Sequence, residues 1–282
     1  MALIETVNLC KYFKTPKGML HAVEDVSFTL DEGKTLGVVG ESGCGKSTLG
    51  RTVLRLHQAT SGQILYEGND ILNYNRKEMQ KVQRNMQMIF QDPYSSLDPR
   101  MSIRSLVTEP IEVIGSRDKM SAATEKERVD EIMNMCGLPP QYNNLYPHEL
   151  DGGMRQRVGL ARAMVLDPKF VVCDEPVSAL DVSIQAQILN LLLDLQEKHN
   201  LSYMFITHDL AVVKYISDEI MVMYMGQVVE KAPSDNVFVL PNNGNIILAA
   251  EQAAQAAFDL MAGKYDNGKA TTTEYEEAKT RV

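Results

Sequence analysis

Residues 40–47 read GESGCGKS, which matches the phosphate-loop pattern G-x-x-x-x-G-K-[ST]. Glycines let such a loop curl so that successive backbone N–H groups point inward, and the helix that follows adds the positive end of its dipole. A chance match somewhere in a chain of this length is on the order of 1%. The loop therefore predicts a site for the phosphates of a nucleotide, built from Gly40, Ser42, Gly43, Cys44, Gly45, Lys46, Ser47 and Thr48.

Two side chains of this loop carry specific chemistry. The Lys46 ammonium is expected to bind the β- and γ-phosphates, which gives it a catalytic role, and the Ser47 hydroxyl is expected to ligate Mg²⁺. The predicted cofactors are therefore ATP and Mg²⁺.

Apolar runs around the loop alternate between strand and helix patterns. An amphipathic helix that Asp181 caps follows the run at 170–173, and another helix is predicted at 46–57. This alternation predicts an α/β fold with a mostly parallel sheet, preceded by β-rich runs and interrupted by a helical lobe at about 94–160. Strands are predicted at 23–30, 36–39, 86–90, 170–173, 203–207, 220–224 and 227–230.

Composition narrows the class of partner. The formal net charge of −9 argues against sequence-independent binding to nucleic acid, because such binding needs Lys and Arg side chains to neutralise the phosphates. No apolar run approaches the roughly 18–20 residues that cross a bilayer. The four cysteines are scattered without metal spacing, which favours a reduced intracellular chain. A role at a membrane would therefore need a partner.

Two acids, Asp174 and Glu175, follow the apolar strand at 170–173. In phosphate-loop ATPases the first such acid helps to hold Mg²⁺, and Glu175 is placed to polarise a water for attack on the γ-phosphate. Taken alone, the run also fits a strand end with two solvated acids. His208 follows the strand at 203–207 and is either a γ-phosphate contact or a structural histidine, since its spacing alone favours neither.

Five ordered motifs together resemble the ATP-binding cassette family, and more narrowly the ATP-binding subunits of oligopeptide and dipeptide importers, a group that includes nickel importers. The resemblance covers about residues 1–232 and implies a phosphate-loop NTPase core with a mostly parallel sheet, an N-terminal antiparallel β subdomain and an inserted α-helical subdomain. It rests on residues 40–48, MIFQDPYSSLDPR at 88–100, 147–162, CDEPVSALD at 173–181 and ITHD at 206–209.

The resemblance implies a role for each matching residue. Gln91 should contact Mg²⁺ or the attacking water, Asp174 should organise Mg²⁺, and Glu175 should be the catalytic base. His208 should contact the γ-phosphate, and Asp181 should lie at a dimer seam.

The resemblance also implies the adenine contact and the partners. Adenine should stack on Phe13 or, as second choice, Tyr12, although either ring could instead be a core aromatic. The implied partners are a second ATP-binding subunit, permease subunits that contact residues 94–104, and an extracytoplasmic solute-binding protein. The implied location is the cytoplasmic face of the cell membrane.

The chain departs from the family pattern at its phosphate-facing segment, where L-S-G-G-Q is replaced by Leu150-Asp151-Gly152-Gly153-Met154. The two glycines can still present N–H groups to a phosphate. The Asp151 carboxylate would repel that phosphate by roughly 3 kcal/mol at about 5 Å and an effective dielectric near 20. Asp151 could also simply cap its own helix. In cassettes of this family the segment of one subunit faces the nucleotide of the other, so two copies of this chain would weaken both sites. We therefore expect a heterodimer in which one nucleotide site is weak.

The second departure is the C-terminus, where the resemblance ends after about residue 237. The expected organisation is an ATP-binding domain over 1–237 and an alanine-rich helix with a polar tail over 238–282. Rival functions are a DNA-repair or chromosome ATPase, which would need long coiled coils, and a non-hydrolysing ATP-binding regulator. Glu175 and His208 argue against the second.

Overall fold

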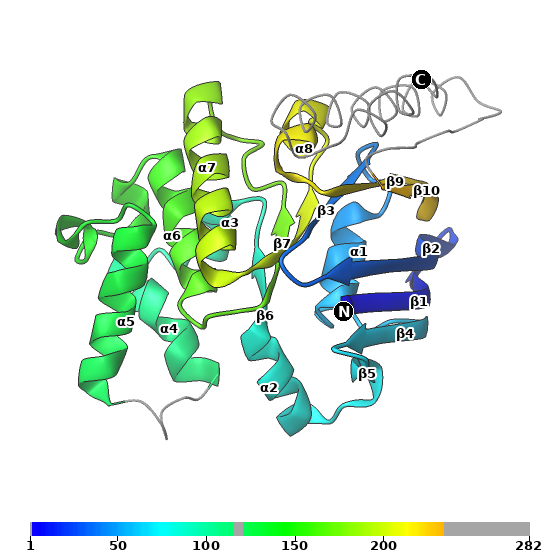
Figure 1. The fold of residues 1–282 in the computed structure, drawn as a ribbon, viewed down its shortest axis with the longest axis horizontal. Helices are drawn as coiled ribbons and strands as arrows, with labels where there is room; N and C mark the ends of the chain where they lie inside the picture. Colours follow the sequence, from blue (N-terminus) through cyan, green and yellow to red (C-terminus); the bar gives the residue numbers. More distant parts are fainter. Residues whose placement is uncertain (1, 115–120, 234–282) are drawn as a thin grey trace, which may run out of the picture. The chain divides into compact units, whose positions relative to one another are not determined.

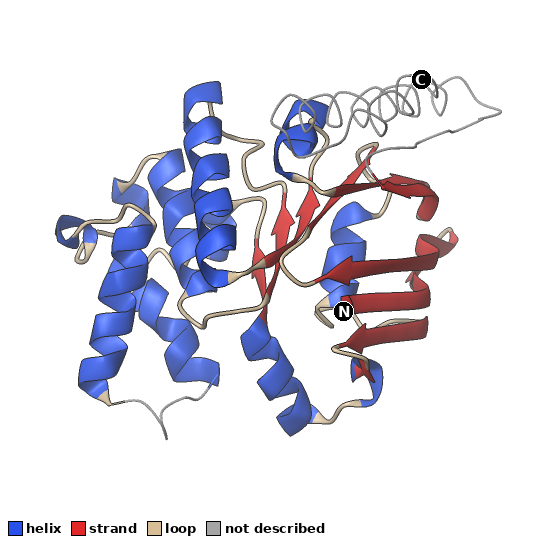
Figure 2. Cartoon of the chain, viewed as in Figure 1, coloured by secondary structure: helices blue, strands red, loops and turns tan. Residues whose placement is uncertain are grey.

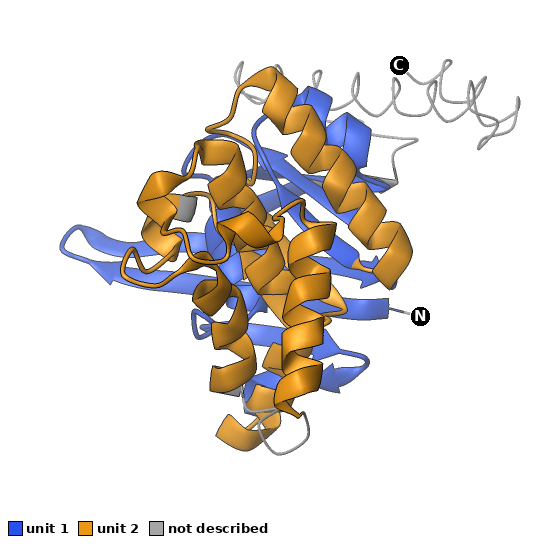
Figure 3. Ribbon diagram, turned by 90° about the vertical axis from the view of Figure 1, so that its left-hand side faces the viewer, with its two compact units in different colours: residues 1–73, 202–282 blue, residues 74–201 orange. Residues whose placement is uncertain are grey.

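The computed structural model describes residues 2–114 and 121–233 of the 282-residue chain. The chain divides into two compact units, residues 1–73 with 202–282 (unit 1) and residues 74–201 (unit 2) (Figure 3). The helical lobe expected at about 94–160 lies within unit 2. The C-terminal helix and tail expected over 238–282 lie outside the described residues, so the boundary at residue 237 remains a prediction.

Unit 1 contains the expected N-terminal antiparallel sheet, with the strand order β2-β1-β4-β5 (Figure 1). In β2, buried Val26, Phe28 and Leu30 alternate with exposed residues, which is why its period was readable in the sequence. The sequence did not reveal β1, because several register shifts against β2 interrupt its alternation. The strands are β1 (Ala2–Thr15), β2 (Gly18–Asp31), β4 (Ser61–Tyr66) and β5 (Asn69–Asp70).

A second, mostly parallel group of strands forms the other half of unit 1. The strand β3 (Thr35–Gly40) pairs in parallel with β8 (Ser202–Ile206) and with β9 (Glu219–Tyr224), and β10 (Gln227–Pro233) runs antiparallel to β9. Met225 and Gly226 form the two-residue turn between β9 and β10 with φ of 46° and 84°, as a type I′ hairpin turn requires.

Two helices belong to this part of unit 1, α1 (Lys46–Val53) and α8 (Leu210–Ile216). The predicted helix over 46–57 is too long, since α1 ends at Val53. Arg55 adopts φ of 55°, a left-handed conformation that stops the helix without the glycine that usually marks such an end.

Unit 2 is rich in helices around one parallel strand pair (Figure 2). The strand β6 (Met86–Ile89) pairs with β7 (Phe170–Asp174), whose residues are all buried. Asp181 caps α7 as predicted, because its carboxylate accepts a hydrogen bond from the Ile184 N–H at 3.0 Å. The helices are α2 (Arg76–Asn85), α3 (Pro93–Ser96), α4 (Ile103–Ile114), α5 (Ala122–Met135), α6 (Gly152–Met164) and α7 (Val182–His199).

Every predicted strand coincides with an observed one, and the α/β class is confirmed. Within residues 2–114 and 121–233, none of the helices combines the length and the apolar character that crossing a membrane requires.

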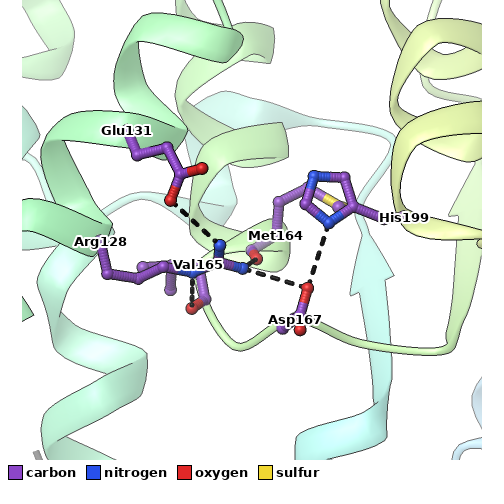
Figure 4. A network of polar contacts seen from close by, with 6 residues as sticks. All are labelled: Arg128, Glu131, Met164, Val165, Asp167 and His199. Atoms are coloured by element: carbon purple, nitrogen blue, oxygen red, sulfur yellow. Dashed lines mark hydrogen bonds and ion pairs between the residues drawn. The ribbon is translucent and has the colours of Figure 1, made fainter.

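The C-terminal end of α6 is held by one arginine of α5, as Figure 4 shows. Arg128 donates to the carbonyl oxygens of Met164 and Val165 and to the Asp167 carboxylate, which also contacts His199 Nδ1 at 3.1 Å. The last carbonyls of a helix have no partner inside the helix, and a cation there also meets the negative end of the dipole. Arg128 therefore fixes the end of α6 against α5, and Asp167 extends the network to α7.

Replacing Arg128 with alanine should lower the free energy of unfolding by about 1–2 kcal/mol, because the α6 carbonyls and Asp167 lose a charged donor. Arg128→Lys should recover only part of this loss, since an ammonium lacks the planar fork of donors. Urea unfolding measures both values. The matched control is Arg100→Ala, which removes an ion pair to Asp98 from a side chain that is 87% exposed. Equal losses in the two alanine variants would contradict a structural role for the Arg128 network.

Candidate nucleotide-binding site

The phosphate loop connects β3 to α1 in unit 1 and needs glycine at two positions for reasons of space. Gly40 adopts φ of 151°, and a Cβ atom there would lie 2.1 Å from the Met223 carbonyl oxygen. Gly45 adopts φ of 107°, and a Cβ atom there would lie 2.0 Å from the Ala22 carbonyl oxygen. The loop is thus pressed against β9 on one side and β2 on the other, and larger residues would displace it.

The Lys46 side chain folds back over the loop that precedes it. Its Nζ donates to the carbonyl oxygens of Gly40 at 2.7 Å and Glu41 at 2.8 Å, and the residue is 5% exposed. The ammonium is therefore held within the loop that is expected to bind the phosphates of the nucleotide. No side chain caps α1 at Gly45, which suits a helix N-terminus that binds an anion.

The other loop residues differ in exposure. Ser42 and Gly43 are exposed, whereas Ser47 and Thr48 at the start of α1 are half-buried. Cys44 is buried, and this burial raises the pKa of its thiol. The Cys44 carbonyl oxygen accepts a hydrogen bond from the Gly226 N–H at 2.8 Å, so the turn between β9 and β10 supports the loop.

His208 lies at the same strand edge as the phosphate loop within unit 1. The strands β3 and β8 run in parallel with Val38 opposite Ile206, so Gly40 and His208 each lie two positions after this pair. His208 is exposed, and the neighbouring Asp209 caps α8 by accepting from the Ala211 N–H at 2.8 Å. Ligands of α/β proteins bind at the carboxyl edge of a parallel sheet, and His208 lies at that edge.

The two adenine candidates, Tyr12 and Phe13, have different surroundings in unit 1. The Tyr12 ring stacks on His21 with centroids 4.1 Å apart, and its hydroxyl donates to Glu24 at 2.7 Å. Hydrogen bonds to Cys10 and Glu24 raise the pKa of the Tyr12 phenol. The sequence interpretation missed His21 and Glu24, whose alignment with Tyr12 depends on the irregular register between β1 and β2.

Phe13 instead packs edge-on against His57 with centroids 5.5 Å apart, and Lys11 Nζ lies 4.6 Å from its ring centroid. Both aromatic rings are only half-buried, so neither is a fully buried core residue. The choice between them remains a prediction.

In unit 2 the structure brings Gln91 and Glu175 together, although they are 84 residues apart in sequence. Gln91 Nε2 donates to Glu175 Oε2 at 2.9 Å. Glu175 adopts φ of 47°, a left-handed conformation that is strained for a residue with a side chain, and Ser178 donates twice to its carbonyl oxygen. Asp174, the preceding residue, is fully buried at the end of β7. Backbone strain of this kind is often found at active sites.

Asp151, Gly152 and Gly153 lie at the N-terminus of α6. Asp151 caps the helix, since its Oδ1 accepts from the Met154 N–H at 2.7 Å, and the carboxylate remains exposed. A Cβ atom on Gly153 would lie 2.7 Å from Ile184 Cγ2, so close packing against α7 by itself explains a glycine there. The same segment therefore satisfies a structural requirement and leaves a carboxylate available at its surface.

Two glycine variants test the fit of the phosphate loop. Gly45→Ala should lower the free energy of unfolding by about 3 kcal/mol, because it combines left-handed strain with a steric clash against Ala22. Gly43→Ala should cost only about 1–2 kcal/mol, since Gly43 has φ of 81° but no atom lies within 4 Å of its added Cβ. Urea unfolding measures the difference. If the two substitutions lower the free energy of unfolding by the same amount, close packing of Gly45 against β2 is not a constraint on the loop.

The chain is similar to curated peptide-transport proteins over most of its length. It is 49% identical over 243 residues to the oligopeptide transport ATP-binding protein OppF of Bacillus subtilis, covering 85% of this chain and 78% of that protein. It is 46% identical over 241 residues to a putative peptide import ATP-binding protein of Brucella ovis, covering 86% of this chain and 75% of that protein.

Solved structures share the fold. The dimeric ATP-binding cassette MJ0796 bound to ADP and Pi superposes with a TM-score of 0.74 at 27% identity, covering 82% of this chain and 98% of that one. A nucleotide-free ATP-binding cassette from an ABC transporter gives a TM-score of 0.70 at 25% identity, covering 83% and 92%.

Two family models match the chain. Residues 222–260 match the FakA-like C-terminal model of fatty acid kinases, over a short segment that lies mostly outside the described residues. Residues 23–178 match the ABC transporter model, and this range contains the phosphate loop, Gln91, the start of α6, Asp174 and Glu175. The chain therefore belongs to the ABC transporter family and is one of its ATP-hydrolysing cassettes.

Proposed function

We propose that the chain is the ATP-hydrolysing subunit that drives import of oligopeptides or dipeptides through a membrane permease. The observation that carries this proposal is the 49% identity to an oligopeptide transport ATP-binding protein over 243 residues. The chain works at the cytoplasmic face of the cell membrane as a peripheral subunit, with permease subunits and an extracytoplasmic solute-binding protein as its partners. Import of nickel or another small solute is the alternative, since the permease and the binding protein select the cargo.

Binding of the triphosphate is assigned to the phosphate loop. Backbone N–H groups at the N-terminus of α1 stabilise the phosphate charge, and Lys46 adds a point charge that is already held within the loop. Adenine stacks on Phe13 or, as second choice, on Tyr12. His208 contacts the γ-phosphate from the end of β8.

Hydrolysis is assigned to Glu175 as the general base that takes a proton from the attacking water. Gln91 supports this role, because its amide donates a hydrogen bond to the Glu175 carboxylate at 2.9 Å and so helps to orient it. The strained backbone at Glu175 fixes the direction in which the carboxylate points.

The side chains assigned to Mg²⁺ fit its chemistry, because Mg²⁺ prefers oxygen ligands and is held by one or two carboxylates together with substrate phosphates. The assigned ligands are the Ser47 hydroxyl, the Gln91 amide oxygen and the Asp174 carboxylate. Asp174 is fully buried at the end of β7, directly before Glu175. When bound, Mg²⁺ neutralises charge on the transferred phosphate.

The subunit is proposed to act as a dimer in which the segment Asp151–Gly153 faces the partner's nucleotide. The Asp151 carboxylate is exposed and would lie close to that phosphate, so two copies of this chain would weaken both sites. We therefore favour a heterodimer whose other subunit carries an ordinary segment. A purely regulatory ATP-binding subunit with a degenerate segment is the alternative within this proposal.

The contact with the permease is assigned to residues 94–104. Tyr94 is 61% exposed at the start of this stretch, and an exposed aromatic ring is a common anchor at protein interfaces. The stretch begins three residues after Gln91, which binds Glu175, so the permease would act close to the catalytic base.

The Glu175→Gln variant should bind ATP but hydrolyse it about 10²- to 10⁴-fold more slowly, because the general base is lost while the phosphate loop is intact. Phosphate release measures turnover, and size-exclusion chromatography with ATP should reveal trapped nucleotide-bound dimers. Lys46→Ala is the companion variant and should lose nucleotide binding. If Lys46→Ala hydrolyses ATP at the rate of the parent, the assignment of triphosphate binding to the phosphate loop is wrong.

Substituting Asp151 should raise the ATPase rate of the assembled transporter, because repulsion at the partner's nucleotide is removed. Asp151→Asn is the sharper variant, since asparagine caps a helix as well as aspartate and lacks only the charge. The expected rise lies between about threefold and a hundredfold, the upper bound being set by a repulsion of about 3 kcal/mol. Asp151→Ser should behave in the same way. Unchanged rates in both variants would remove the asymmetric-site hypothesis.

A further inference from the structure

One arginine of α6 holds the turn that precedes the phosphate-facing segment. Arg155 lies one helical turn after Asp151, and its Nη1 donates to the Leu150 carbonyl oxygen at 2.7 Å and to the Pro147 carbonyl oxygen at 3.3 Å. Because Leu150 directly precedes Asp151, the position of this guanidinium fixes the path by which the chain enters α6.

The same guanidinium lies over an aromatic ring of α3. The Arg155 Cζ atom is 4.7 Å from the centroid of the Tyr94 ring, within the range of a cation–π contact. Tyr94 belongs to a helix that Asp92 caps by accepting from the Tyr94 N–H at 2.8 Å. Since Asp92 follows Gln91 directly, Tyr94 is tied closely to the residue that binds Glu175.

A second arginine of α6, two turns further along, binds α3 and α4. Arg162 Nη1 donates to the Ser96 carbonyl oxygen at 2.6 Å, and its Nη2 lies 3.2 Å from Glu109 Oε2. Arg162 therefore fastens the end of α3 to α6 and α4. The two arginines share a helix and a neighbour. Only Arg155 of the two joins α3 to the turn before the phosphate-facing segment, through its cation–π contact with Tyr94 and its hydrogen bonds to the turn.

We propose that Arg155 is a positioning residue that couples Tyr94 to the segment Leu150–Gly153, so that engagement of Tyr94 by the permease changes the ATPase rate. The inference rests on the proposed function, since it assumes that residues 94–104 meet the permease. A guanidinium can lie flat on a ring while donating in its own plane to carbonyl oxygens. A shift of the Tyr94 ring therefore moves the group that holds the Leu150 carbonyl, through one continuous set of contacts.

The test is a double-mutant cycle read as a ratio of rates. The ratio divides the ATPase rate of the transporter, assembled with its permease in lipid vesicles, by the rate of the ATP-binding subunit without the permease. Arg155→Lys keeps the charge but loses the flat stacking surface, and Tyr94→Leu keeps an apolar side chain but loses the ring. Each should lower the ratio about fivefold, and the double variant should lower it no further. Tyr94→Phe keeps the ring and should keep the ratio within about twofold of the parent.

A merely structural role predicts a different pattern, and Arg162→Lys is the matched control for it. That variant should lower the thermal unfolding midpoint and change both rates together, so that their ratio stays at the parental value. If Arg155→Lys behaves like Arg162→Lys, or if the losses of Arg155→Lys and Tyr94→Leu multiply, the coupling role is wrong.

The experiment also separates this inference from the proposed function. ATP hydrolysis that the permease stimulates in the parent, with an unaltered ratio in Arg155→Lys and Tyr94→Leu, overturns the coupling role alone. A parent that shows no hydrolysis in the assembled transporter overturns the proposed function and the inference that rests on it.

Discussion

The close approach of the phosphate loop to its neighbouring strands is the constraint on which the rest of unit 1 depends. The Ala22 carbonyl oxygen lies 2.0 Å from where a Cβ atom on Gly45 would be, and the Met223 carbonyl oxygen lies 2.1 Å from where one on Gly40 would be, so two strands limit the space of the loop. A loop in this position keeps the Lys46 ammonium against its own carbonyl oxygens and starts α1 without a side-chain cap. Binding geometry for a phosphate therefore follows from packing between strands rather than from the loop alone.

In unit 2 the comparable constraint acts on α6, which several arginines hold, among them Arg128, Arg155 and Arg162. Arg155 holds the turn before the helix, Arg162 in the last turn of the helix binds α3 and α4, and Arg128 binds the carbonyl oxygens at the end of the helix. Hydrogen bonds from charged donors are stronger than neutral ones and fix direction as well as distance. The helix that begins with the phosphate-facing segment is thus positioned at both ends by charged contacts to its neighbours.

Sequence patterns predicted much of this structure where the chemistry was local. Residues 40–48 fit a pattern with few alternatives, the strands with clear apolar runs were found, and Asp181 was identified as a helix cap. Patterns failed where the backbone departs from its usual period, as in β1 with its register shifts and at Arg55 with its left-handed φ. Contacts between distant residues, such as Gln91 with Glu175, or Arg155 with Tyr94, depend on the fold and leave no local signal.

The two-residue turn between β9 and β10 has a consequence for how the chain tolerates change. Surface hairpin turns are ordinarily the places where extra residues are accepted most easily. Here Gly226 accepts a hydrogen bond from the Glu24 N–H at 2.7 Å and donates one to the Cys44 carbonyl oxygen at 2.8 Å. A single inserted residue in this turn would therefore break the hydrogen bonds by which Gly226 connects β2 to the phosphate loop. The phosphate loop, some 180 residues away in sequence, would lose part of its support.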